Sequence, residues 1–238
     1  MTESHLRRPS ASSSGWAWQT PALIMFCGAL VFMLSAGTRQ TFGLFLYPMT
    51  SAFGWDRETF AFAIALLTLL TGAVTPFMGM LADRHGSGRV ILFGGAMWVV
   101  GLYAMAHSQT PLALWVSAGL LVGLGASATS VSIAIGAVGK RVPEAMRSRA
   151  LGVVAAGGSV GQMLMLPLAH GLIVWQGWQL ALVLLGGVMV LMIPAALGVS
   201  GRALQERSDG DLSISAALRE ATRHRGFWLL TAGFFVCG

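Results

Sequence analysis

Gly79-Met-Leu-Ala-Asp83-Arg84-His-Gly86-Ser-Gly-Arg89 is a short polar segment between two long apolar runs, Thr59–Ala82 and Arg89–His107. Each run is close to or above the ~20 residues that a helix needs to cross the hydrocarbon layer. Asp83 falls at the end of the first run, where the dipole of a helix disfavours an anion, so its carboxylate needs a partner. Gly86 permits a tight turn. The stretch therefore predicts a compact loop between two membrane-spanning helices.

The same alternation of apolar runs and polar breaks continues along the chain. The sequence is 55% hydrophobic and only 10% charged, whereas about a quarter of the residues of a soluble domain are charged. The predicted spans are Gln19–Tyr47, Thr59–Ala82, Arg89–His107, Pro111–Gly139, Ala150–Val174 and Trp178–Val199. Runs such as Leu180–Leu197 lack the alternating polarity of a spanning β-strand, which excludes a β-barrel. We predict an all-α, polytopic membrane protein.

Lys and Arg residues set the predicted orientation in the membrane. With the N-terminus inside, the inside segments hold 13 of the 15 cationic residues, namely Arg7, Arg8, Arg84, Arg89, Lys140, Arg141, Arg147, Arg149, Arg202, Arg207, Arg219, Arg223 and Arg225. The outside loops hold only Arg57, and Arg39 lies within the first span. This asymmetry predicts a cytoplasmic N-terminus in the plasma (inner) membrane. Because the net charge of +6 is placed beside apolar spans, a nucleic-acid partner is not expected.

Four segments follow from this pattern. Residues 1–18 form a cytoplasmic tail, 19–199 a six-helix bundle, 200–226 a cytoplasmic connector, and 227–238 the start of a truncated seventh helix. In the connector, Ile214, Leu218 and Ala221 recur at helical spacing, which favours an amphipathic surface helix, with a flexible linker as the alternative. Gly28-Ala-Leu-Val aligns with Gly119-Leu-Leu-Val, a weak sign of a three-plus-three inverted repeat.

The segment 79–89 resembles the G-x-L-A-D-R-x-G-x-x-R/K signature of the major facilitator superfamily, at the same place between helices two and three. The resemblance implies a conformational latch formed by Gly79, Asp83, Arg84, Gly86 and Arg89. Gly79 would allow close helix contact, and Arg89 or the N-terminus of a helix in the other half of the carrier would be the partner of Asp83. The alternative is that the two arginines serve orientation only, which leaves Asp83 and the glycines unexplained.

The second inside loop carries Pro143-Glu144-Ala-Met-Arg147, similar to the P-E-x-x-R element of the same superfamily. Glu144 and Arg147 share a helix face and are expected to join a charge network with the first latch.

A narrower resemblance is to the monocarboxylate and oxalate/formate carriers. Residues 150–161, Ala-Leu-Gly-Val-Val-Ala-Ala-Gly-Gly-Ser-Val-Gly, are similar to their small-residue helix, and Gly15-Trp-Ala-Trp to the end of their other signature. Ser13 and Ser14 depart from that signature, which has an acid and a glycine there. Independently of family, small residues allow helices to pack closely in lipid.

Arg39 is the leading candidate for substrate chemistry, because a charge within a span costs at least about 2.5 kcal/mol and usually marks a pathway or a partner. The resembling carriers have a cation here that attracts the substrate carboxylate. Snorkelling to the interface is the alternative. Gln40, Thr129 and Gln162 are candidate hydrogen-bond donors in the same cavity, although each could equally bond its own helix. The sequence places no Asp or Glu within a span, so a proton-carrying carboxylate is expected in the other half.

The expected function is secondary active transport of a small organic anion, foremost a monocarboxylate, by alternating access, as symport or antiport with protons as the candidate coupling ion. Expected partners are the lipid bilayer, the substrate anion and the C-terminal half of the carrier; no cofactor or metal is expected. The alternatives are a carrier for another organic solute and a non-transporting sensor or scaffold on the same fold. An enzyme is disfavoured because no catalytic arrangement is visible in the spans.

Overall fold

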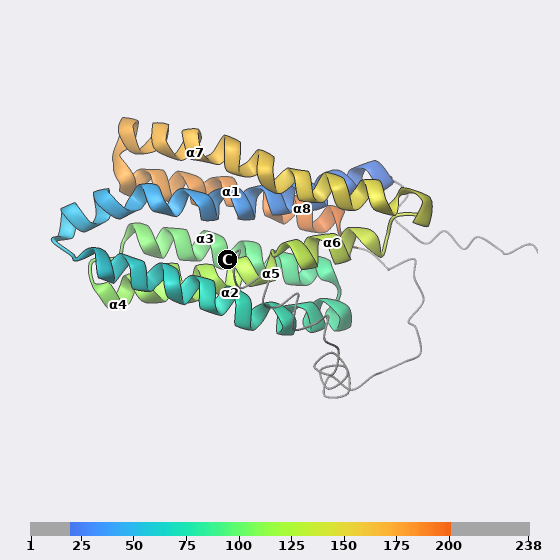
Figure 1. Cartoon of the computed structure of the whole chain (residues 1–238), viewed down its shortest axis with the longest axis horizontal. Helices are drawn as coiled ribbons and strands as arrows, with labels where there is room; N and C mark the ends of the chain where they lie inside the picture. Colours follow the sequence, from blue (N-terminus) through green and yellow to red (C-terminus); the bar gives the residue numbers. More distant parts are fainter. Residues whose placement is uncertain (1–19, 201–238) are drawn as a thin grey trace, which may run out of the picture. The chain divides into compact units, whose positions relative to one another are not determined.

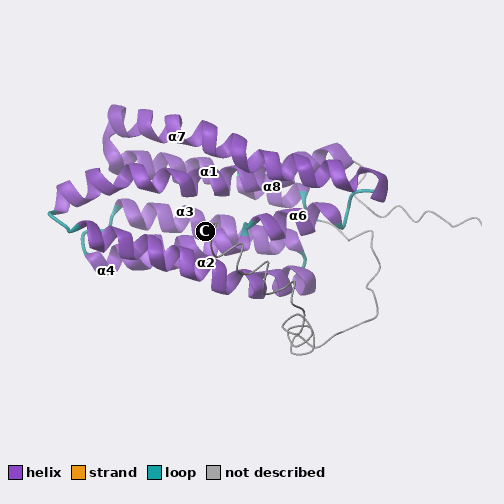
Figure 2. Cartoon of the chain, in the orientation of Figure 1, coloured by secondary structure: helices purple, strands orange, loops and turns teal. Residues whose placement is uncertain are grey.

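A computed structural model describes residues 20–200, and these residues form helices joined by short loops, with no strand among them (Figure 2). The helices run along one another in alternating directions (Figure 1). Their bounds are α1 Pro21–Phe53, α2 Arg57–His85, α3 Ser87–Ala106, α4 Pro111–Leu114, the π-helical turn η1 Trp115–Leu121, α5 Val122–Ala128, α6 Val131–Gly139, α7 Glu144–Met189 and α8 Met192–Gly198. The predicted tail, the seventh helix and all of the connector except Ser200 lie outside the described residues.

Five helical stretches of the described chain are long and apolar enough to cross a membrane, and the last of them, Glu144–Gly198, makes two crossings. The chain reverses at Gly177, whose φ of 81° and ψ of 167° lie in a region open almost only to glycine. α7 therefore supplies the fifth span and, after Gly177, most of the sixth, which α8 completes (Figure 1). The fourth span is the series α4, η1, α5 and α6. The fold is the predicted six-span, all-α bundle.

Local sequence explains where several spans begin and end. The hydroxyl of Thr20 accepts a hydrogen bond from the Leu23 amide at 3.3 Å, and Thr110 accepts one from the Ala113 amide at 3.2 Å. In both cases a proline follows at the first helical position, where it loses no hydrogen bond. α1 ends at Gly54, which adopts a left-handed conformation with φ of 65°.

The two sets of three spans interlock rather than pack separately. α1 lies against the first part of α7, where a Cβ added to Gly37 would stand 2.6 Å from the carbonyl oxygen of Gly161. α2 lies against the fourth span, with Gly119 facing Leu66, and α3 lies against the sixth span, with Gly95 facing Met192. If spans one, two and three are exchanged with spans four, five and six, the contact of the first with the fifth span becomes the contact of the fourth with the second. The contact of the third with the sixth span maps onto itself. The packing thus agrees with the predicted three-plus-three repeat.

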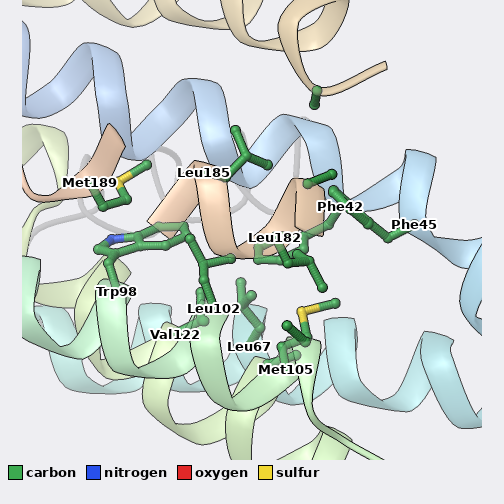
Figure 3. Close-up of a cluster of buried hydrophobic side chains, with 14 of the residues drawn as sticks. Phe42, Phe45, Leu67, Trp98, Leu102, Met105, Val122, Leu182, Leu185 and Met189 are labelled. Carbon is green, nitrogen blue, oxygen red and sulfur yellow. The ribbon is translucent and has the colours of Figure 1, made fainter. Parts of the chain in front are cut away.

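The largest buried cluster draws side chains from all six spans. Figure 3 shows Trp98 and Leu102 of α3 together with Leu182, Leu185 and Met189 of α7, all fully buried. The rings of Trp98 and Phe42 stack at a centroid distance of 6.2 Å. Because lipid is as apolar as these side chains, the cluster is held by close packing rather than by exclusion of water.

Candidate substrate site and conformational latch

The fourth span is broken inside the membrane. α5 ends at Ala128, Thr129 leaves the helical region (φ −115°, ψ 21°), and Ser130 is extended (φ −63°, ψ 159°) before α6 starts at Val131. The carbonyl of Ser130 accepts hydrogen bonds from the amides of Ile133 and Ala134 and so opens the new helix. Discontinuous helices in transporters commonly lie at substrate or ion sites, because backbone groups freed at the break can face a polar cavity. The break therefore marks where a substrate site is expected.

A hydroxyl cluster at the break ties three helices together. The Thr129 hydroxyl lies 2.8 Å from Ser35 Oγ of α1 and accepts a hydrogen bond from Trp98 Nε1 of α3 at 3.1 Å. It also donates to the carbonyl oxygen of Gly125 at 2.9 Å. Ser35 and Thr129 are both buried. The break is thus anchored to α1 and α3 rather than left loose in the bilayer.

Arg39 and Gln40 are exposed on α1, one turn beyond Ser35. A helix rises about 6 Å over four residues, so the Ser35–Thr129 contact brings the break of span four to within about one turn of Arg39 along the bundle. Gln162 of α7 is exposed as well and follows Gly161, which packs on Gly37 of α1. Arg39, Gln40 and Gln162 therefore lie at similar depth along the bundle, about one helical turn from the level of the break, and all three are exposed within the described residues.

Thr129 does not share that surface. Its side chain is fully buried, and its hydroxyl is taken up by Gly125, Trp98 and Ser35. The bond to the Gly125 carbonyl lies within its own helix, and such a bond was the alternative to substrate binding that the sequence left open. Because its hydroxyl is already hydrogen-bonded in the described residues, Thr129 is left out of the set proposed to touch the substrate.

The predicted latch lies at the end of the bundle that carries the clustered cations, which we call the basic end and define by Arg84, Arg89, Lys140, Arg141 and Arg147. Gly86, with φ of 93° and ψ of 136°, is the only residue between α2 and α3, so the tight turn is confirmed. Within the described residues the partner of Asp83 is Lys140 and not Arg89, one of the two partners that were predicted. The carboxylate of Asp83 pairs with Lys140 Nζ at 2.5 Å, across from α2 to the end of the fourth span.

Three residues of the latch make few contacts within the described chain. Arg89 lies exposed at the start of α3, and Arg84 is exposed at the end of α2. An added Cβ at Gly79 would meet no atom of residues 20–200 within 4 Å, so the close helix contact expected of Gly79 is not made inside this bundle. Gly79 therefore faces open space within the described residues.

The second loop lies directly beside the first. Glu144 is exposed in the first turn of α7, where its charge is favourable to the helix dipole. The Arg147 guanidinium lies over the end of α6, about 3.6 Å from a Cβ added to Gly139, the neighbour of Lys140. The two predicted loops therefore meet at the basic end through Lys140.

A hollow of about 260 Å³ opens between α2 and α6 next to the ion pair. Its lining is small or polar, and consists of Thr75, Gly79, Ala82, Asp83, Ser87, Ser132, Ile133, Gly136, Ala137 and Lys140. On the far side of the break, α5 packs tightly on α2, with Gly123 facing Leu67 and Leu70. The break thus separates a packed segment of span four from a segment that diverges from α2 and is joined to it by the Asp83–Lys140 pair.

Sequence reasoning missed Lys140 and Arg141, which it counted only as orientation charges. The signal available was their position, since both follow an apolar span at the same membrane side as Asp83. Arg141 is 7% exposed, and this burial lowers the pKa of its guanidinium, which stays cationic at neutral pH.

A six-span bundle with a broken fourth span, an arginine within the first span and paired loop charges at one end defines a polytopic, all-α membrane protein. The chain belongs to the Major Facilitator Superfamily, whose model it matches over residues 25–238.

Similar proteins include monocarboxylate transporter 11 of Mus musculus, 29% identical over 76% of this chain and 39% of that protein. The uncharacterized MFS-type transporter YhjX of Escherichia coli is 25% identical over 91% of this chain and 54% of that protein. Monocarboxylate transporter 12 of Homo sapiens is 28% identical over 80% of this chain and 36% of that protein. The chain therefore spans about half, or less, of the length of these relatives.

Proposed function

We propose that this chain forms the N-terminal half of a carrier that moves a small organic anion, foremost a monocarboxylate, across the membrane by alternating access. The observation that carries the proposal is the exposed Arg39 within α1, held about one turn from the break in span four by the 2.8 Å contact between Ser35 and Thr129. The names of two similar proteins, monocarboxylate transporters 11 and 12, support the same substrate class.

The chemistry of the site suits a carboxylate. The Arg39 guanidinium offers paired N–H donors that match the two oxygens of a carboxylate, and Gln40 and Gln162 add neutral amide donors. An unpaired arginine within a span costs at least about 2.5 kcal/mol, a cost that an anion bound in the cavity would offset. The C-terminal half would close the cavity, and protons are the proposed coupling ion, with their carboxylate in that half.

The charges at the basic end supply the proposed conformational control. Asp83 and Lys140 hold α2 and α6 together in the form described here, and the open surface at Gly79 lies beside them. In the proposed cycle the pair and its neighbours Arg84, Arg89, Glu144 and Arg147 form and break contacts with the other half. The basic end is proposed to face the cytoplasm of a plasma (inner) membrane, in keeping with the positive-inside rule.

The test uses the full-length carrier in liposomes, with uptake of labelled lactate, formate and oxalate measured with and without a pH gradient. Arg39→Ala is expected to lower uptake about 10- to 100-fold, since a hydrogen bond to a charged group contributes about 1.5–3 kcal/mol. Arg39→Lys should retain part of the activity because the charge stays. The matched control is Arg57→Ala, which removes an exposed cation at the start of α2, at the end of the bundle opposite to the basic end.

Each outcome decides a different statement. If none of the three anions is taken up, the substrate assignment is wrong, and a carrier for another solute or a sensor on the same fold takes its place. If uptake is saturable but Arg39→Ala matches Arg57→Ala, the anion site lies elsewhere. Uptake that is unaffected by a pH gradient would argue against proton coupling.

A further inference from the structure

We propose that Thr129 is a positioning residue: its hydroxyl holds the break of span four in register with Arg39 and so sets the affinity of the site for its anion. The inference rests on the proposed function and adds to it a residue that touches no substrate. The atoms that carry it are the Thr129 hydroxyl, its partners on α1 and α3, and the extended residue Ser130 that follows.

The hydrogen-bond inventory at Thr129 is complete. A threonine hydroxyl has one proton and two lone pairs. The proton goes to the carbonyl oxygen of Gly125, at 2.9 Å. An indole N–H can only donate, so Trp98 fills one lone pair at 3.1 Å, and Ser35 Oγ, at 2.8 Å, donates to the other. One oxygen atom therefore fixes α1, α3 and the end of α5 at a single point.

The methyl group of Thr129 is fixed too. A Cβ added to Gly94 of α3 would stand 2.8 Å from Thr129 Cγ2, so the methyl lies directly on the backbone of α3. The two functions of the side chain can therefore be separated. Valine keeps the shape of the side chain and loses the hydroxyl, whereas serine keeps the hydroxyl and loses the methyl.

Location distinguishes this contact from ordinary packing. Ser35 precedes Arg39 by one helical turn, and Thr129 is the C-cap at which α5 stops, directly before the extended Ser130 that opens α6. Within residues 20–200 the side-chain oxygens of Thr38 and Ser130 are buried without a hydrogen-bond partner, so Thr129 is the hydroxyl that ties the break to its neighbours. A shift at Thr129 would move the break relative to Arg39.

The chain supplies a matched control. Ser108 and Ser117 form another buried hydroxyl pair, at 3.1 Å, which joins the end of α3 to the fourth span at the opposite end of the bundle. Ser117→Ala removes a buried hydroxyl contact of the same kind from the same fourth span, but far from the break. A purely structural role predicts that the Ser117 and Thr129 variants behave alike.

The experiment measures anion uptake by the full-length carrier for Thr129→Val, Thr129→Ser, Ser35→Ala and Ser117→Ala, with lactate as the probe. Thr129→Val removes all three hydrogen bonds of the hydroxyl and is expected to raise KM about five- to tenfold, with the maximal rate changed less than about twofold. Ser35→Ala should raise KM less than Thr129→Val does. Thr129→Ser, which keeps the hydroxyl, should have a KM close to that of the wild type. Ser117→Ala should leave KM unchanged.

A second measurement is independent of transport. Hydrogen exchange of the Ile133 and Ala134 amides, which bond to the Ser130 carbonyl, reports on the break itself. Thr129→Val is expected to speed this exchange about tenfold relative to Ser117→Ala. Equal exchange in the two variants, or equal loss of melting temperature with KM unchanged, would overturn the positioning role. If wild type takes up no anion, the proposed function fails, and the exchange result still decides whether Thr129 holds the break.

Discussion

α1 and α7 pack backbone against backbone at Gly161, and substituting this glycine tests the contact. A Cβ added to Gly161 would lie 2.1 Å from the carbonyl oxygen of Met33 and 2.9 Å from its Cα. These are backbone atoms, so no side-chain rotation can relieve the clash. Since carbon and oxygen atoms need more than about 3 Å, the two helices must separate by about 1 Å.

The cost of Gly161→Ala follows from this geometry. Overpacking of a closely packed site costs about 1–3 kcal/mol, and the same separation loosens the neighbouring contact at Gly37. Alanine regains up to about 1 kcal/mol of helix propensity. We expect a net loss of about 1–2 kcal/mol, which lowers the melting temperature by about 2–8 °C for a protein of this size.

The assay is thermal unfolding of the purified carrier in detergent, followed by the fraction that remains monodisperse after heating. Gly171→Ala is the matched control, because it lies in the same helix and an added Cβ there meets no described atom within 4 Å. Gly171→Ala should melt at or slightly above the wild-type temperature. If the two variants melt together, α1 and α7 do not approach each other as described, and the interlocked packing of the spans is wrong.

Three further predictions concern the loops and the buried thiol. The side chains of Asp83 and Lys140 are 67% and 41% exposed, so Lys140→Gln should change the free energy of unfolding by less than about 1 kcal/mol. Reversing either charge alone should impair transport, and exchanging the two charges should restore it. If the exchange does not restore transport, the Asp83–Lys140 pair is not part of the latch. Gly177→Ala should cost about 1–3 kcal/mol because its backbone conformation excludes a side chain, and a melting temperature equal to that of Gly171→Ala would refute the reversal at this residue. Cys27, which is 7% exposed, should react with a maleimide at least about tenfold more slowly in the folded carrier than after denaturation in SDS, and equal rates would show that the α1 interior is open.

Much of the site followed from local pattern. Asp83 and Gly86 were placed by their spacing at a helix end, and the structure confirms the turn at Gly86. Arg39, Gln40 and Gln162 stood out because polar side chains are costly within a span, and all three are exposed in the bundle. That cost depends only on the residue and the span in which it lies, so it can be predicted without knowing which other helices surround it.

Other features needed the folded chain. No proline or glycine marks residues 126–130, so the break at Thr129 had no local signal, and it depends on partners on α1 and α3 that are distant in sequence. Lys140 is 57 positions from Asp83, and only the convergence of α2 and α6 makes it the partner.

The sequence by itself determined that the chain lies in a lipid bilayer, how often it crosses and which class of fold it has. The length of each apolar run and the distribution of Lys and Arg between the loops are local properties, and the bilayer acts on them without reference to the tertiary fold. Only the tertiary structure decided which face of each helix is buried. In lipid the inward and outward faces are both apolar, so helical periodicity does not separate them, and Thr129 turned inward while Arg39, on the neighbouring helix at nearly the same depth, remained exposed.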